Sequence, residues 1–470
     1  MSMNEKMKNA VLVAIQLPKT SSLETEASLQ ELTRLVTTLG YNVVGSVIQK
    51  RSTDKSSSVL GEGKLTELAE WTGGTGRIAA MVEHKLSKAA QKWQDEKNEN
   101  SETNEDEDSA GLLSEDQKKS AQIVIVDTDL SPSQLRNLES ATGVGVLDRT
   151  GVIIEIFSRH AKTKAARLQV EIARLTYVAP RLRETGGGED RGGGGVGGKG
   201  SGESSLELDK RKIRDRIKEL KTELESIGNE HQVRRARREQ EISVALVGYT
   251  NAGKSSLMRA MTGSEVLVAD KLFATLDTTI RPLHPETRPK VLMSDTVGFI
   301  KKLPHDLVAS FKSTLDEALH ASLLLFVVDS SDVSFRSQLE VTKSVLAEVG
   351  ATDVPSLLIL NKKDRLSELD VTDLKLEYPD AIMISTRDPN DLEMLRGKIM
   401  SYFESTMLDE DLFIPYTVQG VIGEIRSKMR VLAESYTDKG VTLKVRSSIE
   451  NLAAIKKKLN ILPVKNKYSI

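Results

Sequence analysis

Residues 242–255 read ISVALVGYTNAGKS, and this stretch decides the fold of the central part of the chain. The apolar run ISVALV predicts a buried strand, and it is followed at once by the pattern Gly-x-x-x-x-Gly-Lys-Ser. Glycines let backbone N–H groups wrap around phosphates, and the N-terminus of the helix expected next adds partial positive charge. The stretch therefore predicts an α/β phosphate-binding domain.

The residues of this loop have separate expected roles. Lys254 is the candidate for neutralising the β- and γ-phosphates of a nucleotide, and the Ser255 hydroxyl is the candidate ligand of Mg²⁺. The backbone of the whole loop would contact the nucleotide. Its residues are Gly248, Tyr249, Thr250, Asn251, Ala252, Gly253, Lys254 and Ser255.

A second loop follows the apolar run PKVLMS and reads Asp295-Thr296-Val297-Gly298-Phe299. Asp295 stands where a carboxylate would hold Mg²⁺ through a water molecule, and Gly298 would offer its backbone N–H to the γ-phosphate. In many switch nucleotidases the next position carries a glutamine that orients the attacking water. Phe299 can neither donate nor accept a hydrogen bond, so a group outside this triplet has to position that water.

Between these two loops lies the candidate first switch. Phe273, Ala274, Thr275, Leu276 and Asp277 are its expected nucleotide-contacting residues. Thr275 is preferred over Thr278 and Thr279 as a Mg²⁺ ligand because flanking apolar residues would anchor it. A threonine that ligates the metal only while the γ-phosphate is present makes an order–disorder switch.

The base is indicated by Asn361, Lys362, Lys363 and Asp364, which follow the apolar run SLLIL. The Asp364 carboxylate can accept hydrogen bonds from the N1–H and N2–H₂ groups of guanine, whereas adenine has an acceptor at N1 and no N2 amine. Asn361 and the stem of Lys362 would frame the ring. Ser385, Thr386 and Arg387, after the apolar run AIMI, form a third candidate loop.

Composition limits the remaining possibilities. A chain of 470 residues is too long for one hydrophobic core, so we expect several domains. No cysteine is present, which excludes disulfides, thiolate metal sites and a cysteine nucleophile. No stretch approaches 18 uninterrupted apolar residues, so no transmembrane segment is expected. His160, His231, His284 and His305 fall outside the motifs and are interpreted as structural or surface residues.

The domain organisation is predicted from local changes in composition. Alternating strands and helices predict an N-terminal α/β domain with a first arm helix over 1–185, and its acidic insertion at 94–118 is predicted to be disordered. A helical pattern continues for about thirty residues beyond Thr150. Residues 186–202 form a glycine-rich loop, with 11 of the 32 glycines.

A second arm helix is expected at 203–240, where Ile213, Ile217, Leu220, Leu224 and Ile227 form one apolar stripe. Two helices flanking a glycine loop indicate an antiparallel helical arm with a mobile tip, and an ordinary linker is the alternative. The phosphate-binding domain is expected over 241–405. A small α+β domain is expected over 406–470.

Taken together, these motifs resemble the HflX family of ribosome-associated GTPases. Within the nucleotide-binding domain the resemblance rests on GYTNAGKSSLMRAMTG, KLFATLDTT, DTVGFIKKLPHDLVASFKSTLDEA and NKKD. Upstream it rests on LSPSQLRNLE and VLDRTGVIIEIFSRHAKTKAARLQVEIARLTYVAPRL. Lys199, Ser201 and Ser205 depart from the usual Arg, Pro and Gln of the family.

The resemblance implies a GTPase, slow alone and stimulated by ribosomes, that binds the large (50S) subunit and splits stalled or idle 70S ribosomes under stress. It implies that the glycine-rich arm reaches 23S rRNA near the peptidyl-transferase region, in a cytoplasmic protein that is expected to be a monomer. Membrane association would be peripheral, and DNA is not an expected partner. Candidate phosphate contacts are Arg181, Arg183, Arg191, Lys199, Lys210, Arg211 and Lys212, with a second patch at Lys456, Lys457, Lys458, Lys465 and Lys467.

Two alternatives stay open at this point. One is a large-subunit assembly GTPase, and the other is a GTP-sensing scaffold that does not hydrolyse, for which Phe299 is the argument. Asn251 resembles the loop asparagine of potassium-activated GTPases, which implies a possible K⁺ ligand; a simple capping role is the alternative.

Overall fold

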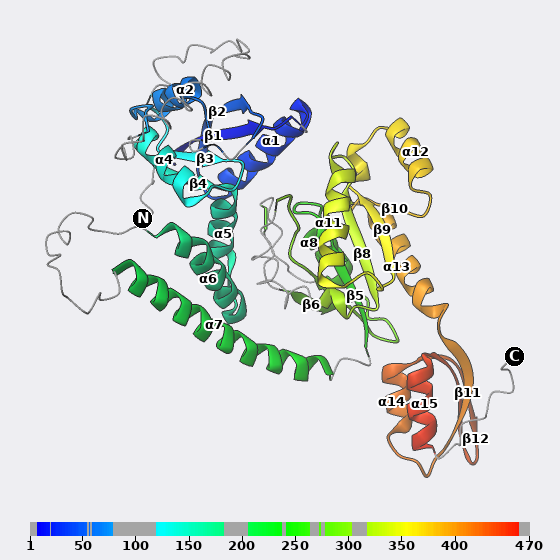
Figure 1. Cartoon of the computed structure of the whole chain (residues 1–470). Helices are drawn as coiled ribbons and strands as arrows, with labels where there is room; N and C mark the ends of the chain where they lie inside the picture. Colours follow the sequence, from blue (N-terminus) through cyan, green and yellow to red (C-terminus); the bar gives the residue numbers. More distant parts are fainter. Residues whose placement is uncertain are drawn as a thin grey trace, which may run out of the picture. The chain divides into compact units, whose positions relative to one another are not determined.

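The structure is a computed structural model, and it describes residues 7–18, 20–53, 56, 59–78, 119–182, 205–236, 241–263, 272–273, 278–302 and 317–459 (Figure 1). The chain divides into two compact units. One comprises residues 1–159 and 177–206, and the other comprises residues 160–176 and 207–470.

The N-terminal unit contains a parallel four-stranded sheet in the order β2-β1-β3-β4. Its strands are β1 (Asn9–Gln16), β2 (Asn42–Lys50), β3 (Ile123–Val126) and β4 (Gly145–Asp148). Its helices are α1 (Ser22–Thr38), α2 (Glu62–Thr72), α4 (Pro132–Thr142) and α5 (Arg149–His160). Capping boxes fix the start of α1 at Ser21 and that of α4 at Ser131.

One face of this sheet is covered by α2 and α4. Leu68 and Trp71 of α2, with Leu138 of α4, pack on valines of all four strands. Trp71 lies so close to Gly45 that a Cβ at this glycine would stand 2.4 Å from the indole ring. The close approach explains a glycine in the middle of β2, where it would otherwise weaken the strand.

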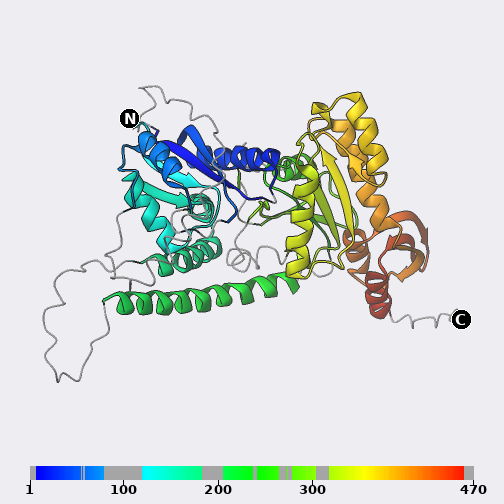
Figure 2. The ribbon, with the colours of Figure 1, turned by 45° about the horizontal axis from the view of Figure 1, so that its top comes forward.

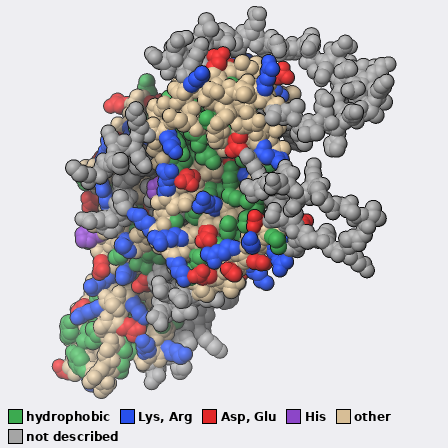
Figure 3. All heavy atoms as spheres, turned by 90° about the vertical axis from the view of Figure 1, so that its left-hand side faces the viewer, with side chains coloured by type: hydrophobic (Ala, Val, Ile, Leu, Met, Phe, Trp, Pro, Cys, Tyr) green, Lys and Arg blue, Asp and Glu red, His purple; other side chains and the backbone are tan. Residues whose placement is uncertain are grey.

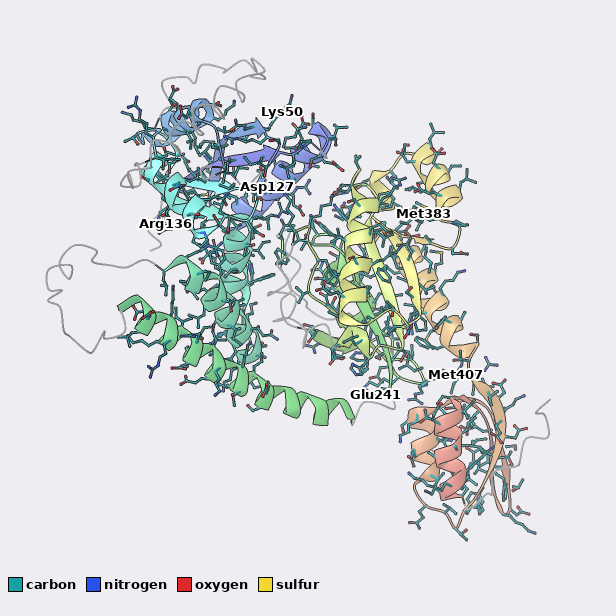
Figure 4. All side chains as sticks on the ribbon, in the orientation of Figure 1. Lys50, Asp127, Arg136, Glu241, Met383 and Met407 are labelled. Carbon is teal, nitrogen blue, oxygen red and sulfur yellow. The ribbon has the colours of Figure 1, made fainter. Side chains whose placement is uncertain are left out.

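Buried charges gather at the carboxyl end of the sheet. Arg149 is 1% exposed and forms ion pairs of 2.7 Å with Asp127 and 2.6 Å with Glu31. Asp127 directly follows β3 (Figure 4). Burial opposes the charge of Arg149, but the two carboxylates outweigh it and raise the pKa of the guanidinium. This cluster is an internally compensated part of the core.

Asp148 organises a second set of contacts in the same unit. Its carboxylate accepts hydrogen bonds from the Tyr177 hydroxyl at 2.8 Å and from Arg181 at 3.0 Å. Arg181 also donates to the carbonyl of Leu130 and stacks 3.7 Å from the centroid of the Tyr177 ring. The guanidinium of Arg181 is therefore engaged within the protein, which removes it from the candidate phosphate contacts.

The helical stretch predicted beyond Thr150 is present, but it consists of two helices with a break after His160. After α5 ends at His160, helix α6 (Lys164–Val178) begins anew, because the Thr163 hydroxyl accepts a hydrogen bond from the Ala166 N–H and caps it. A short 3₁₀ turn, η1 (Ala179–Arg181), follows.

Helix α6 packs along α7 (Ser205–Ala236), and the two run antiparallel (Figure 2). Lys164 pairs with Glu223 and Glu171 with Arg216, so numbers rise on one helix as they fall on the other. The apolar seam contains Leu168, Ile172 and Leu220, joined by four more partly buried residues: Leu175, Ile217, Leu224 and Ile227. Four of the five predicted stripe residues of the second helix, all but Ile213, thus lie on the packed face of the pair.

The central domain contains a six-stranded sheet in the order β10-β9-β8-β5-β7-β6, parallel except for β6. The strands are β5 (Ile242–Val247), β6 (Thr279–Pro282), β7 (Val291–Asp295), β8 (Leu323–Asp329), β9 (Ser356–Asn361) and β10 (Ile382–Met383). The helices are α8 (Lys254–Thr262), α11 (Phe335–Val349), η2 (Lys363–Arg365), α12 (Glu368–Glu377) and α13 (Pro389–Glu404).

Helices cover both faces of this sheet. Leu257 of α8 and Ile399 of α13 share one core with the strands, and Phe335 of α11 and Leu374 of α12 share the core on the opposite face. This doubly covered, mostly parallel sheet confirms the predicted α/β fold class. Its carboxyl edge gathers the ends of β5, β7, β8 and β9, where ligands bind in open α/β sheets.

The C-terminal part forms an antiparallel sheet in the order β11-β13-β12, with two helices on one face. Its elements are β11 (Leu408–Pro415), α14 (Val421–Lys428), β12 (Arg430–Thr437), β13 (Gly440–Ser447) and α15 (Ile449–Lys458). In α15, Lys456 pairs with Glu410 and Lys458 with Glu424, so two of the candidate RNA-facing lysines have acidic partners.

Several expectations lie outside the described residues. They are the acidic insertion at 94–118, the glycine-rich loop at 186–202, and the cations Arg183, Arg191, Lys199, Lys465 and Lys467. Where side chains are described, the face in Figure 3 carries both signs of charge, with Lys and Arg interspersed among Asp and Glu. Among the described helices, none is long and apolar enough to cross a membrane.

Candidate functional site

The loop between β5 and α8 wraps around the ammonium group of Lys254. Lys254 is 6% exposed, and its Nζ donates to the carbonyls of Gly248 at 2.9 Å and Tyr249 at 2.8 Å. Gly253 has a φ of 97°, and a Cβ there would stand 2.2 Å from Nδ2 of Asn361. Only glycine fits both this backbone conformation and this approach.

The environment of Lys254 weakens its hold on a proton. Burial lowers the pKa of Lys254 to about 8, and the Asp295 carboxylate acts in the opposite, raising direction. A charged ammonium held by two carbonyls in a desolvated loop is suited to an anion, because phosphate oxygens can pair with its charge.

We expect the affinity for GDP to be about fourfold lower at pH 8.5 than at pH 7.0, because less of Lys254 is charged before binding. The stability of the nucleotide-free protein should instead increase as the pH rises. The folded pKa of about 8 lies below the unfolded value of 10.5, so the unfolded chain binds more protons between them. Lys254 therefore makes the free energy of unfolding of the nucleotide-free protein rise from pH 8 to pH 10.5. Titration calorimetry with GDP at both pH values measures the first effect.

The same titrations on Lys254→Met are the control, since that variant lacks the ammonium. An equal pH dependence in the variant would assign the effect to another group.

Ser255 and Asp295 place two oxygen ligands side by side. The Ser255 hydroxyl donates to Oδ2 of Asp295 at 2.7 Å, and Asp295 is fully buried at the end of β7. A hydroxyl and a carboxylate are ligands that Mg²⁺ accepts, and they lie beside the ammonium of Lys254. The residues present therefore fit a magnesium ion held jointly with nucleotide phosphates.

The loop after Asp295 is held against the phosphate-binding loop. Phe299 is 2% exposed, and its backbone carbonyl accepts a hydrogen bond from the N–H of Thr250 at 2.8 Å. The Phe299 side chain is thus part of the core and contributes nothing to placing water. Gly298 lies so close that a Cβ there would stand 3.2 Å from Nζ of Lys254.

The Asn361-Lys362-Lys363-Asp364 segment is anchored to the phosphate-binding loop from the end of β9. The buried Asn361 donates from Nδ2 to the Ala252 carbonyl at 2.9 Å, and Lys362 donates to the Asn251 carbonyl at 2.8 Å. Oδ1 of Asn361 is buried without a hydrogen-bond partner among the described residues. A buried acceptor of this kind is one that a ligand can satisfy.

The carboxylate of Asp364 is held ready to accept hydrogen bonds. The Ser385 hydroxyl donates to Oδ1 at 2.7 Å, which lowers the pKa of Asp364, and Arg387 lies 3.6 Å from Oδ2. The N–H of Ser385 in turn donates a hydrogen bond to the Asp391 carboxylate at 2.7 Å, and Lys363 forms an ion pair with the same carboxylate. The base-recognition segment and the Ser385 loop therefore form one hydrogen-bonded structure.

Asp329, which we did not single out in the sequence, is a further member of the site. It ends β8, and its Oδ2 accepts from Nζ of Lys362 at 2.6 Å. Its Oδ1 accepts from the hydroxyl and the N–H of Ser331. Asp329 directly follows the apolar run LLLFVV, just as Asp295 follows an apolar run. The same sequence pattern could therefore have identified Asp329.

Asp329→Asn is expected to lower the affinity for GDP by about fivefold to tenfold, because Lys362 loses the charged partner that holds it over the Asn251 carbonyl. Equilibrium titration with a fluorescent GDP derivative measures this. Asp332→Asn is the matched control: Asp332 makes the corresponding turn bonds to Ser334 in the same loop. An affinity equal to that of the wild type in Asp329→Asn would contradict the assignment.

Among the residues that the structure describes, most of the predicted site residues lie together. Ala274, Thr275, Leu276 and Asp277 lie outside the described residues, while Phe273 is buried. Thr296 is anchored by its hydroxyl on the Leu246 carbonyl. Asn251 is exposed with a φ of 61°, and Thr386 is half-buried beside Ser385.

A phosphate-binding loop after β5, an Asp-x-x-Gly loop after β7 and a guanine-type recognition segment after β9 define a P-loop GTPase. A GTPase HflX from Gluconacetobacter diazotrophicus is 56% identical over 450 residues, which cover 96% of this chain and 97% of that protein. The chain belongs to the GTPase HflX family: it binds GTP and GDP and hydrolyses GTP.

Two further relatives, from Caldanaerobacter subterraneus and Escherichia coli, agree with this assignment. GTPase HflX of Caldanaerobacter subterraneus is 36% identical, over 94% of this chain and 91% of that protein, and that of Escherichia coli is 37% identical, over 77% and 74%. A GTP-binding protein from Sulfolobus solfataricus, solved in complex with GDP, matches with 25% identity and a TM-score of 0.41, over 84% of this chain and 98% of that one.

Three family models match successive parts of the chain. They are a GTP-binding GTPase N-terminal region over residues 26–101 and 108–158, a GTP-binding GTPase middle region over 160–238, and a 50S ribosome-binding GTPase over 243–362. The resemblance inferred from the sequence motifs is therefore confirmed along the chain.

Proposed function

We propose that this GTPase binds the large ribosomal subunit and splits stalled or idle 70S ribosomes under stress, in the cytoplasm and as a monomer. The observation that carries the proposal is the match of residues 243–362 to the family described as 50S ribosome-binding GTPases. Binding by the GTP form separates the subunits, and hydrolysis allows release of the factor.

The antiparallel pair α6–α7 supports an arm that reaches ribosomal RNA. Lys210, Arg211 and Lys212 are exposed near the start of α7, a few positions along the chain from the glycine-rich residues 186–202. Cations at this end would contact 23S rRNA phosphates near the peptidyl-transferase region, and such binding weakens as salt concentration rises.

Within the nucleotide site, we assign a role to each of the main predicted residues. Lys254 would bind the β- and γ-phosphates, Ser255 would hold Mg²⁺ directly, and Asp295 would hold it through water. Gly298 donates its N–H to the γ-phosphate, and Asp364 reads the guanine edge. Thr275, which lies outside the described residues, would be a further Mg²⁺ ligand in the GTP form. When bound, Mg²⁺ neutralises charge on the phosphates.

Because Phe299 is buried, the attacking water has to be oriented by a group outside this loop. We propose that the docked ribosome supplies it, which makes hydrolysis slow alone and faster with ribosomes. The exposed Asn251 is a candidate ligand of K⁺, which would add positive charge beside the phosphates. Equal GTPase rates in K⁺ and Na⁺, with and without ribosomes, would remove the potassium proposal.

Gradient sedimentation tests the main proposal. Adding the protein with a non-hydrolysable GTP analogue to 70S ribosomes should yield free subunits, and a control reaction with GDP should not. Intact 70S ribosomes in both reactions would overturn splitting and favour a large-subunit assembly factor. Phosphate release without any stimulation by ribosomes would count against a ribosomal partner of either kind.

A further inference from the structure

The Asp295–Phe299 loop is joined to the phosphate-binding loop by a short main-chain pairing beyond the ends of β5 and β7. Tyr249 and Phe299 form an isolated parallel bridge. The Thr250 N–H donates to the Phe299 carbonyl at 2.8 Å, and the Phe299 N–H donates to the Gly248 carbonyl at 3.2 Å. Two loops that both face the phosphates therefore share backbone hydrogen bonds.

The side chain of Tyr249 adds a third link. Its ring is 4% exposed, and its hydroxyl accepts a hydrogen bond from the N–H of Lys301 at 2.6 Å. Residues 248–250 thus hold the other loop at two points: the backbones of Gly248 and Thr250 bond to Phe299, and the Tyr249 hydroxyl bonds to Lys301. We name this set of contacts, made by residues 248–250 with residues 299–301, the Tyr249 clasp.

The clasp fixes where Gly298 lies. Gly298 is the residue before the paired Phe299, and a Cβ on it would stand 2.8 Å from Cγ2 of Thr250 and 3.2 Å from Nζ of Lys254. Its backbone is therefore kept next to the ammonium that belongs to the phosphate site. The position of the Gly298 N–H therefore depends on these main-chain contacts and on Tyr249.

We propose that Tyr249 is a positioning residue that sets the preference for GTP over GDP, by holding the Gly298 N–H where the γ-phosphate arrives. The inference rests on the γ-phosphate role assigned to Gly298. When a hydrogen-bond donor is fixed before the nucleotide enters, no conformational entropy is lost in ordering it on binding. The clasp therefore strengthens binding of the γ-phosphate. It leaves GDP binding unaffected, because GDP has no γ-phosphate.

Tyr249→Phe in the full-length protein tests this, because it removes the hydroxyl and keeps the buried ring. We expect the affinity for a non-hydrolysable GTP analogue to fall about fivefold, as for loss of one hydrogen bond, while the affinity for GDP stays within about twofold. The kcat for GTP hydrolysis without ribosomes should fall as well. Tyr378→Phe, which removes a hydroxyl elsewhere in the same domain, should change neither affinity.

Each other result overturns the inference. An unchanged ratio of the two affinities, including an equal loss for both nucleotides, would make Tyr249 purely structural. A raised preference for the GTP analogue would mean that the clasp competes with the γ-phosphate. A wild-type protein that binds GDP and the analogue equally well would leave no preference for Tyr249 to set, and would not bear on the ribosome splitting proposed above.

Discussion

Asp364→Asn is expected to lower the affinity for GDP by about 10²- to 10⁴-fold and to raise that for xanthosine diphosphate. The carboxylate accepts two hydrogen bonds from guanine, each charge-assisted and worth about 1.5–3 kcal/mol. An asparagine side chain offers one acceptor and one donor. This pair suits xanthine, in which an oxygen acceptor stands where guanine has its N2 amine. Competition of both diphosphates against a fluorescent GDP derivative measures the change.

The Ser385 hydroxyl can still donate to the asparagine oxygen, so this variant should keep the local fold. Asp370→Asn is a suitable control, since Asp370 accepts from Ser367 in a similar way at the start of α12. A variant with Asn at 364 that retains its affinity for GDP would show that another segment reads the base.

Lys254→Met is expected to reduce GTP affinity by about 10²- to 10⁴-fold and to abolish measurable hydrolysis. The ammonium is desolvated and would contact two phosphates, each contact worth about 1.5–3 kcal/mol. Methionine keeps most of the buried stem, so the melting temperature should not fall. Titration calorimetry and single-turnover phosphate release give the two readouts.

Lys343→Ala removes a lysine that pairs with Glu340 on the surface of α11, and it should leave both readouts unchanged. Residual hydrolysis at the wild-type rate in Lys254→Met would reject the assigned role. A lowered melting temperature together with lost binding would show that the ammonium also holds the Gly248 and Tyr249 carbonyls in place.

The sequence was most informative where one local rule governs position. Polar residues at the carboxyl ends of parallel strands meet at one sheet edge, so Asp295 and Asn361 could be placed from the apolar runs before them. The same rule applied to Asp329, but without a motif around it this residue was passed over. The break after His160 was missed because Thr163, a cap, stands inside an otherwise helical pattern.

Other features depend on tertiary contacts that no local pattern encodes. The bridge between Tyr249 and Phe299 joins residues fifty positions apart, and nothing in either loop alone indicates it. The role of Arg181 is a similar case. Its charge indicated an RNA contact, but the guanidinium forms an ion pair with the buried Asp148. Long-range pairing of this kind is decided by the packed fold, and not by propensity.

The central position of β5 has a consequence for how the domain is made. β5 is the first strand of its sheet along the chain, yet its partners come much later: Ile242 pairs with Val291 and Val244 with Leu323. During synthesis the apolar run ISVALV therefore emerges well before either neighbour exists, and such unpaired strands are prone to aggregate. The nucleotide-binding loop is thus among the first parts of its domain to be synthesised and among the last to be completed.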